Sequence, residues 1–311
     1  MRLWRSLQRG AQRPAGVAGF VATVGGFDGI HLGHRALIQR THELALETGL
    51  ATMVVSFEPL PKEFLSSEPV ARLTSFRERW RLLEQHGPEV FCVLPFNARL
   101  RGLRAAEFTA LLAGAGIRQL VIGHDFRAAY RGEADAVWLR QHAPDMGVQV
   151  EVVQPVRTPA GERVSSGLIR QALQAGELQH AARLLGRPYS MRGRVVRGEQ
   201  LGRKLGFPTA NLRLARRQTP MDGIFAVRVR GIAGSGARDG VASLGTRPTV
   251  GGVRPLLEAH VFDFAGDLYG REIEVEFVAR LREERRFDAI ELMVEQMHRD
   301  SAAARAVLAV R

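Results

Sequence analysis

Short apolar runs alternate with longer amphipathic stretches through the N-terminal half of the chain. Runs of apolar and β-branched residues predict strands at 20–24, 51–57, 90–94, 119–122 and 148–153. Apolar positions at helical spacing predict helices at 32–46, 76–85, 105–112, 135–141, 165–174 and 177–185. Strands that alternate with helices usually form parallel sheets. We therefore expect an α/β domain with a Rossmann-like parallel sheet over residues 19–185.

The pattern changes after Gly186-Arg187-Pro188. Short apolar runs separated by glycine predict strands at 191–196, 224–230, 240–244, 257–262 and 273–278. Such spacing is typical of an antiparallel barrel. A last amphipathic stretch, residues 288–308, predicts a closing helix with apolar contacts from Ile290, Leu292, Met293 and Met297. We expect a second domain over residues 186–311, built as an antiparallel β-barrel with a terminal helix.

The segment 25–34 reads Gly-Gly-Phe-Asp-Gly-Ile-His-Leu-Gly-His and joins the first predicted strand to the helix that follows it. Its glycines allow close backbone approach to a ligand, and the N–H groups at a helix start favour an anion. His31 and His34 are three residues apart on one helical face, so both rings could bind the same phosphoryl group. These features predict a triphosphate site.

Other interpretations of the same residues fit less well. A zinc site at His31 and His34 lacks a third ligand placed by a motif, and Cys92 is the single cysteine. The glycine spacing does not match the dinucleotide fingerprint. The segment 198–204 is one residue short of a P-loop, and Leu205 stands where Ser or Thr is required.

Composition narrows the class of protein. With 311 residues and 45% hydrophobic content, the chain can build two cores of ordinary size. A single cysteine excludes an internal disulfide framework and suits a reducing cytoplasm, where we expect the protein. No apolar run reaches the roughly 18 residues of a membrane span, so no membrane partner is expected.

The net charge of +12 could indicate a nucleic-acid binder, which remains one alternative. Basic and acidic residues are interspersed, however, and we find no helix-turn-helix, zinc-finger or RNP pattern. We therefore expect no nucleic-acid partner and attribute part of the excess to small anionic ligands. The sequence leaves the oligomeric state open.

Three further segments carry candidate chemistry. In 163–170, two hydroxyls at a predicted helix cap lie between two arginines and could donate to phosphate, although an ordinary helix N-cap is the favoured interpretation of these residues by themselves. The loop 202–211 combines cations with a Pro-Thr-Ala-Asn turn suited to coordination of a hard cation. In 257–264, Glu258 and His260 share one strand face, and an inward carboxylate is a candidate base. A solvent-facing acid is the alternative.

The segment 26–34 resembles the His-x-Gly-His signature of the nucleotidylyltransferase superfamily, and most closely its bacterial flavin-adenylating branch. Segments 123–127, 163–170, 202–211, 222–226, 257–264 and 281–287 also match, in order, motifs of bifunctional riboflavin kinase/FAD synthetases. The resemblance spans about residues 19–300. It implies that ATP phosphorylates riboflavin to FMN in the barrel, and that a second ATP adenylylates FMN to FAD in the first domain, with Mg²⁺ at both steps.

The resemblance also implies roles for individual residues. In the first domain it implies catalysis by His31 and His34, a flavin contact by Asp125, and nucleotide binding by Gly26, Phe27, Asp28, Arg163, Ser165, Ser166 and Arg170. In the barrel it implies Glu258 as catalytic base and Thr209 and Asn211 as magnesium ligands. The remaining implied contacts are nucleotide binding by Gly202, Lys204 and Gly206 and flavin binding by Arg282 and Phe287.

The chain departs from the family pattern near the first site. Ala128, Ala129, Gly132 and Ala134 replace residues of the 123–135 loop, and Gly167 replaces a threonine. These departures suggest a second alternative, a riboflavin kinase whose adenylyltransferase domain has decayed. A third alternative, an adenylyltransferase for another substrate such as a pantetheine or nicotinate phosphate, leaves the barrel motifs unexplained.

Overall fold

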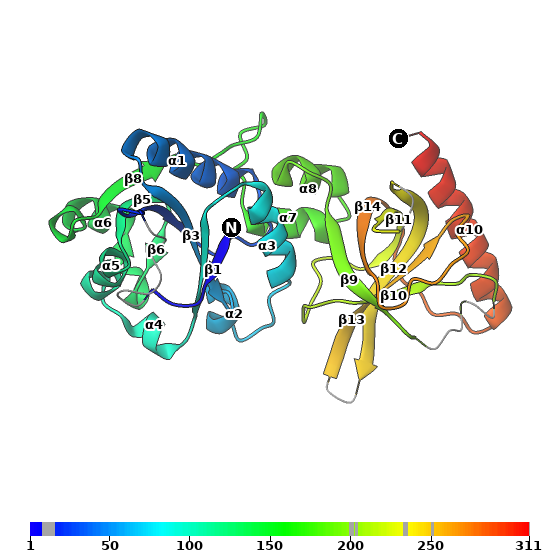
Figure 1. The fold of residues 1–311 in the computed structure, drawn as a ribbon. Coiled ribbons are helices and arrows are strands. Elements are labelled where there is room, and N and C mark those ends of the chain that lie inside the picture. Colours follow the sequence, from blue (N-terminus) through cyan, green and yellow to red (C-terminus); the bar gives the residue numbers. More distant parts are fainter. Residues whose placement is uncertain (8–15, 199–201, 203–204, 233–235, 250–251, 311) are drawn as a thin grey trace. The chain divides into compact units, whose positions relative to one another are not determined.

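The computed structural model describes the chain except residues 8–15, 199–201, 203–204, 233–235, 250–251 and 311. The chain forms two compact units (Figure 1). Unit 1 comprises residues 1–70 and 79–165, and unit 2 comprises residues 71–78 and 166–311. The division describes packing, and the expected domain limits 19–185 and 186–311 stay a prediction.

Unit 1 is built on a parallel sheet with the strand order β1-β4-β3-β2-β5-β8. The strands are β1 (Arg2–Trp4), β2 (Phe20–Val24), β3 (Ala51–Glu58), β4 (Val90–Pro95), β5 (Ile117–Gly123) and β8 (Gln149–Val153). Every residue of β2 is buried, which fits its run of apolar and β-branched residues. The sheet therefore confirms the expected α/β architecture.

Helices flank this sheet (Figure 1). They are α1 (Leu32–Thr48), α2 (Pro61–Leu65), α4 (Ala98–Gly102), α5 (Ala105–Gly114) and α6 (Ala136–His142), together with residues 79–85 of α3 (Phe76–Gln85). Helix α1 follows β2 directly and ends at Gly49, whose φ of 67° is the left-handed conformation typical of a helix C-cap. The connection from β2 to α1 places the 25–34 segment at the carboxyl end of the sheet.

Unit 2 contains a closed antiparallel barrel with the strand order β10-β13-β12-β11-β14-β9. Its strands are β9 (Ser190–Val196), β10 (Ala210–Arg213), β11 (Gly223–Arg230), β12 (Arg238–Thr249), β13 (Gly252–Val261) and β14 (Glu272–Arg282). The expected barrel is confirmed. Strand β10 was not expected, because the Pro-Thr-Ala-Asn sequence was interpreted only as a turn.

The terminal helix α10 (Ile290–Ala309) closes unit 2, as expected, but its buried face differs from the one predicted. Ile290 and Leu292 are more than half exposed, so the apolar contacts expected of them are wrong. The buried positions are Asp300, Ala304 and Leu308, and Ala304 and Leu308 pack with Ala226 of β11.

Helices α7 (Ser166–Gln174) and α8 (Leu178–Leu185) also belong to unit 2, with the segment 71–78. Glu78 in this segment forms an ion pair with Arg216, and both side chains are almost fully buried. Arg216 also donates to the Tyr189 hydroxyl (3.1 Å), which in turn donates to the Leu73 carbonyl (3.2 Å). Segment 71–78 is thus held in unit 2 by a polar network.

Candidate active sites

The two histidines of the 25–34 segment lie together at the start of α1. His31 is the N-cap of this helix, and its Nδ1 accepts a hydrogen bond from the backbone N–H of His34 (3.3 Å). The two rings are stacked, with centroids 3.6 Å apart, and the Phe27 ring lies 5.0 Å from that of His34. The structure therefore brings the expected pair into direct contact.

A cleft of about 290 Å³ opens beside this pair. Its lining includes Phe27, His31, His34, Asp125, Arg163 and Ser165, all in unit 1. Arg163 forms an ion pair with Asp125. Burial acts to raise the pKa of Asp125, but its hydrogen bond to Arg163 and that residue's charge outweigh burial, so the pKa is lowered. The cleft thus contains imidazole, guanidinium and hydroxyl groups suited to phosphate.

The other residues expected to bind this nucleotide lie elsewhere. Gly26 and Asp28 are outside the described lining of the cleft, and Asp28 is buried. Ser166 and Arg170 belong to unit 2, where Arg170 donates to the Ala71 carbonyl (2.6 Å) and the Ser166 carbonyl (3.2 Å). Their roles remain predictions.

The loop that departs from the family pattern has a defined conformation. It forms a short hairpin of β6 (Arg127–Ala128) and β7 (Ala134–Asp135) around the 3₁₀ turn η1 (Tyr130–Gly132). Ala129 has φ 64° and ψ −169°, a region that essentially only glycine occupies without strain. Asp135 caps α6 by accepting from the Trp138 N–H (2.8 Å). The departures therefore place strain at Ala129, not disorder in the loop.

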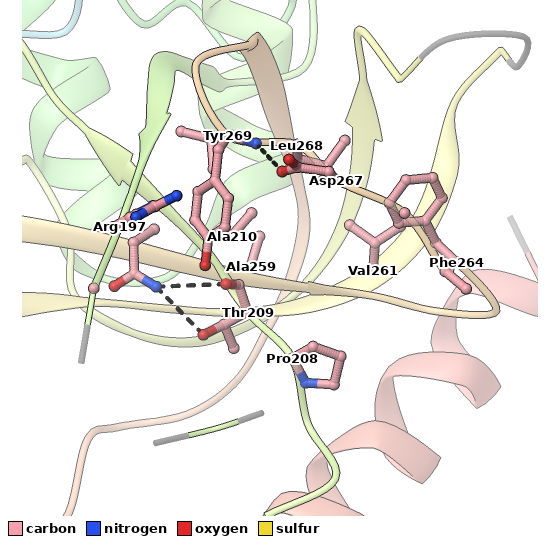
Figure 2. A pocket seen from close by; sticks show the side chains of 15 residues that line it. Arg197, Pro208, Thr209, Ala210, Ala259, Val261, Phe264, Asp267, Leu268 and Tyr269 are labelled. Atoms are coloured by element: carbon pink, nitrogen blue, oxygen red, sulfur yellow. Dashed lines mark hydrogen bonds between the residues drawn. The ribbon is translucent and has the colours of Figure 1, made fainter. Parts of the chain in front are cut away.

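The larger cavity of unit 2, about 640 Å³, lies at the barrel. Its lining includes Arg197, Thr209, Asn211, Phe264 and Tyr269 (Figure 2). The guanidinium carbon of Arg197 lies 5.6 Å from the centroid of the Tyr269 ring. A cation beside aromatic rings is a combination suited to a nucleotide, because rings stack on bases and guanidinium groups pair with phosphates.

Thr209 and Asn211 meet at the edge of this cavity. The Asn211 side-chain amide donates to Thr209 Oγ1 (3.4 Å) and to the Thr209 carbonyl (3.5 Å). This arrangement leaves the Asn211 Oδ1 on the opposite side of its amide group. Gly198 packs against the same amide: a Cβ at this position would lie 2.6 Å from Asn211 Oδ1. As the amide is oriented here, its nitrogen and not Oδ1 faces Thr209 Oγ1; exchange of the amide N and O would bring the two oxygens side by side, the arrangement that Mg²⁺ needs when phosphates supply its other ligands. The role of the pair as magnesium ligands stays a prediction.

Glu258 stands directly opposite Asn211 across the β10–β13 pair. Directly opposed residues of antiparallel strands have side chains on the same face, with Cβ atoms about 5 Å apart. The expected inward orientation of Glu258 is wrong, because its neighbours Leu257 and Ala259 fill the barrel interior with no exposed surface. Glu258 instead lines a second cavity on the outer face of the strand.

This second cavity, about 300 Å³, lies between the barrel wall and α10. Glu258 and His260 come from the strand, Met293 and Met297 from the helix, and Phe287 from the segment that joins β14 to α10. Thr209 lines both cavities, so they adjoin at this residue. An apolar cavity with a carboxylate next to the larger cavity could present a hydroxyl substrate to a nucleotide phosphate.

Arg282 and Phe287, expected to contact a flavin, both line the second cavity. Arg282 makes a two-pronged ion pair with Asp300 of α10, with Nε–Oδ1 and Nη2–Oδ2 distances of 2.9 and 2.7 Å. The guanidinium carbon of Arg285 lies 4.6 Å from the centroid of the Phe287 ring. Asp300 was not among the predicted site residues, although an acid in line with Met293, Met297 and Ala304 on one helix face signals a buried, paired charge.

The glycines and lysine expected to bind nucleotide in the barrel are placed only in part. Gly202 lines the second cavity, and its carbonyl accepts from the Phe207 N–H (2.8 Å). Gly206 has a φ of 85° and is outside the described linings of both cavities. Lys204 lies outside the described residues.

Comparisons with known proteins identify both units. Residues 14–168 match the FAD synthetase family, and residues 185–308 match the riboflavin kinase family. A bifunctional riboflavin kinase/FMN adenylyltransferase of Pseudomonas fluorescens is 44% identical, with 94% of each chain covered. The protein of the same name from Escherichia coli (strain K12) is 40% identical, with 98% of this chain and 97% of that protein covered.

Among solved structures, a macrolide-efflux protein from Streptococcus pneumoniae is similar over 98% of both chains, with a TM-score of 0.80 and 31% identity. The parallel-sheet unit, the barrel unit and their cavities define a two-domain transferase. The chain belongs to the family of bifunctional riboflavin kinase/FMN adenylyltransferases. This membership does not favour the alternative of a decayed adenylyltransferase. Among the described residues, no helix is long and apolar enough to cross a membrane.

Proposed function

We propose that this chain phosphorylates riboflavin to FMN in unit 2 and adenylylates FMN to FAD in unit 1, with ATP as co-substrate in both steps. Both activities follow from membership of the bifunctional family. The observation that carries the assignment of sites is that each unit contains a separate cavity with the matching motif: His31 and His34 in one, Glu258 in the other.

In the adenylyl transfer, a phosphate oxygen of FMN attacks the α-phosphorus of ATP, and pyrophosphate leaves as the new P–O bond forms. The attacking phosphate is already an anion, so the site needs no general base. His31, His34 and Arg163 are the donors we assign to the negative charge that develops on the phosphates. Ser165, and Ser166 and Arg170 after it in the motif, complete the proposed set.

In the kinase step, the larger barrel cavity takes ATP and the second cavity takes riboflavin. Glu258 accepts the proton of the terminal ribityl hydroxyl as its oxygen attacks the γ-phosphorus, and ADP leaves. Arg282 and Phe287 would border the flavin ring. Thr209 and Asn211 would hold Mg²⁺, which when bound would neutralise charge on the ATP phosphates.

Small molecules are the only partners in this proposal, and the interspersed charges support the omission of nucleic acid. We also propose a cytoplasmic location, because a chain with a single cysteine suits a reducing compartment. That residue, Cys92, is buried in unit 1, which is compatible with a reduced thiol.

The direct experiment is to incubate the purified protein with riboflavin, ATP and Mg²⁺ and to separate the flavins by chromatography. FMN should appear first and FAD should follow, and a chelator of divalent cations should stop both steps. FMN without FAD, also when FMN is supplied directly, would instead select the kinase-only alternative.

A further inference from the structure

Arg79 is the largest fully buried side chain in the described part of the chain, with 1% of its surface exposed. It lies on α3 within unit 1. Burial of a guanidinium group is costly unless its donors are satisfied. The groups that accept hydrogen bonds from Arg79 therefore show what its burial is for.

Its partners belong to the segment after β2 and to β3. Nη1 donates to the Gly26 carbonyl (2.9 Å) and to Ser56 Oγ (3.1 Å), and Nη2 donates to Glu58 Oε2 (2.7 Å). The Ser56 hydroxyl also donates to the Gly26 carbonyl, at 3.1 Å. Two donors thus fix the direction of one carbonyl in the 25–34 segment.

The direction of that carbonyl determines the direction of the next N–H. In a planar trans peptide the C=O and N–H bonds point in opposite directions, so the Phe27 N–H points away from Arg79. Phe27 itself has φ 50°, a left-handed conformation that is strained in a non-glycine residue and persists only when neighbours enforce it. Phe27 lines the cleft of His31 and His34, whereas Arg79 is outside its described lining.

We propose that Arg79 is a positioning residue for adenylyl transfer: by holding the Gly26 carbonyl, it keeps the Phe27 N–H turned toward the nucleotide phosphates in the cleft. The inference rests on the proposed function of this cleft. An N–H fixed before the reaction stabilises developing charge without reorganisation. Lysine cannot replace this arginine fully, because an ammonium group lacks the planar fork that reaches Gly26, Ser56 and Glu58 together.

Three variants test the proposal. Arg79→Lys keeps the charge but loses the fork, Ser56→Ala removes the second donor to Gly26, and Arg77→Lys on the same helix is the matched control because its side chain is 77% exposed. Steady-state kinetics are measured separately for FMN adenylylation and for riboflavin phosphorylation, at a temperature where each variant is folded.

Arg79→Lys should lower kcat for FAD formation about 10- to 100-fold, as small displacements of reacting groups do, while KM for FMN changes less than about twofold. Ser56→Ala should lower the same kcat by a smaller factor. Riboflavin phosphorylation should match the wild type in all three variants, and Arg77→Lys should leave both steps unchanged.

A merely structural role would lower thermal stability but leave kcat per folded molecule unchanged. Wild-type kcat for FAD formation in folded Arg79→Lys would therefore overturn the inference. If Arg79→Lys does not fold, Ser56→Ala decides, and an unchanged kcat in it has the same meaning. Failure of the proposed function looks different, because the wild-type protein itself would then form no FAD from FMN.

Discussion

The stacked arrangement of His31 and His34 depends on a small residue between them. A Cβ on Gly33 would lie 3.2 Å from two atoms of the His31 ring, so any larger residue would displace the imidazole. The glycine of the His-x-Gly-His motif is therefore explained by close packing and not by backbone conformation. The position of the His31 ring therefore depends on the absence of one carbon atom, the Cβ of residue 33.

Replacement of both histidines, His31→Ala with His34→Ala, should abolish FAD formation and leave FMN formation intact. Loss of one oriented donor typically costs about 10²–10³ in rate, and this variant removes two. The measurement is the rate of each step with its own flavin substrate. Equal loss of both activities in a folded variant would contradict the assignment of two separate sites.

Glu258→Gln should have the opposite effect. An amide of nearly the same shape cannot accept the ribityl proton, so riboflavin phosphorylation should fall about 10²–10⁴-fold, the usual contribution of a general base. Conversion of supplied FMN to FAD should continue at the wild-type rate. Glu291→Gln is the matched control, because Glu291 is exposed on α10 and is outside the described linings of both barrel cavities. If Glu258→Gln still phosphorylates riboflavin at the wild-type rate, Glu258 is not the catalytic base.

Cys92 should not react in the folded protein. Burial raises the pKa of its thiol from 9.0 to about 12, since the thiolate is poorly solvated in the core. Iodoacetamide at pH 8 should therefore label Cys92 only after addition of denaturant, as mass spectrometry can show.

Below pH 9 the Cys92 thiol is protonated in both the folded and the unfolded state, whereas between pH 9 and 12 only the unfolded chain loses the proton. This group therefore lowers the free energy of unfolding as pH rises through that window.

At the scale of elements, hydrophobic pattern alone predicted those strands and helices whose own residues determine their burial. Strand β2 and helix α3 have the expected bounds, because β2 is a short run of apolar and β-branched residues and α3 has its own apolar period. Strand β1 has three residues and pairs with β4 at the sheet edge, so no local period could reveal it. Strand β10 exists because Asn211 and Leu212 pair with β9 and β13, which are distant in sequence.

The candidate sites divide in the same way. His31, His34 and Glu258 line cavities, as their motifs predicted. The prediction was possible because each motif is a continuous stretch of sequence that belongs to one local part of the fold. Arg79 and Asp300 were missed because their importance arises from partners on other elements. The direction of Glu258 was wrong for a related reason: alternation along a strand separates two faces but does not say which face is interior.

The ion pair between Glu78 and Arg216 is an interaction of elements that the sequence could not show. Arg216→Met leaves Glu78 buried without its cation, so the barrel unit should lose about 3–5 kcal/mol of stability. Hydrogen exchange of the strand amides from β9 to β14 measures this loss without assuming that both units unfold together. Arg217→Met is the control, because Arg217 is exposed. Equal exchange in the two variants would mean that the pair contributes nothing.

At the scale of the whole molecule, each proposed site is built around a cavity whose described lining lies within one unit, although the proposed adenylylation set also includes Ser166 and Arg170 of unit 2. Among the residues that the structure describes, the cleft of His31 and His34 is lined by unit 1, and both barrel cavities are lined by unit 2. Chemistry at one site therefore does not require side chains from the cavity of the other. FMN is the species that links the two reactions.

This separation predicts that two inactive proteins can complement each other. A mixture of Glu258→Gln and His31→Ala/His34→Ala should convert riboflavin to FAD, because FMN made by the histidine variant can dissociate and enter the intact cleft of the other protein. FAD should appear after a lag that shortens as the concentration of the Glu258→Gln protein rises, since FMN must build up in solution before it is consumed. Each variant alone should give no FAD from riboflavin and serves as its own control. If the mixture forms FMN but no FAD, while Glu258→Gln still adenylylates supplied FMN at the same concentration, then FMN does not leave the kinase site freely, and the two sites do not work independently.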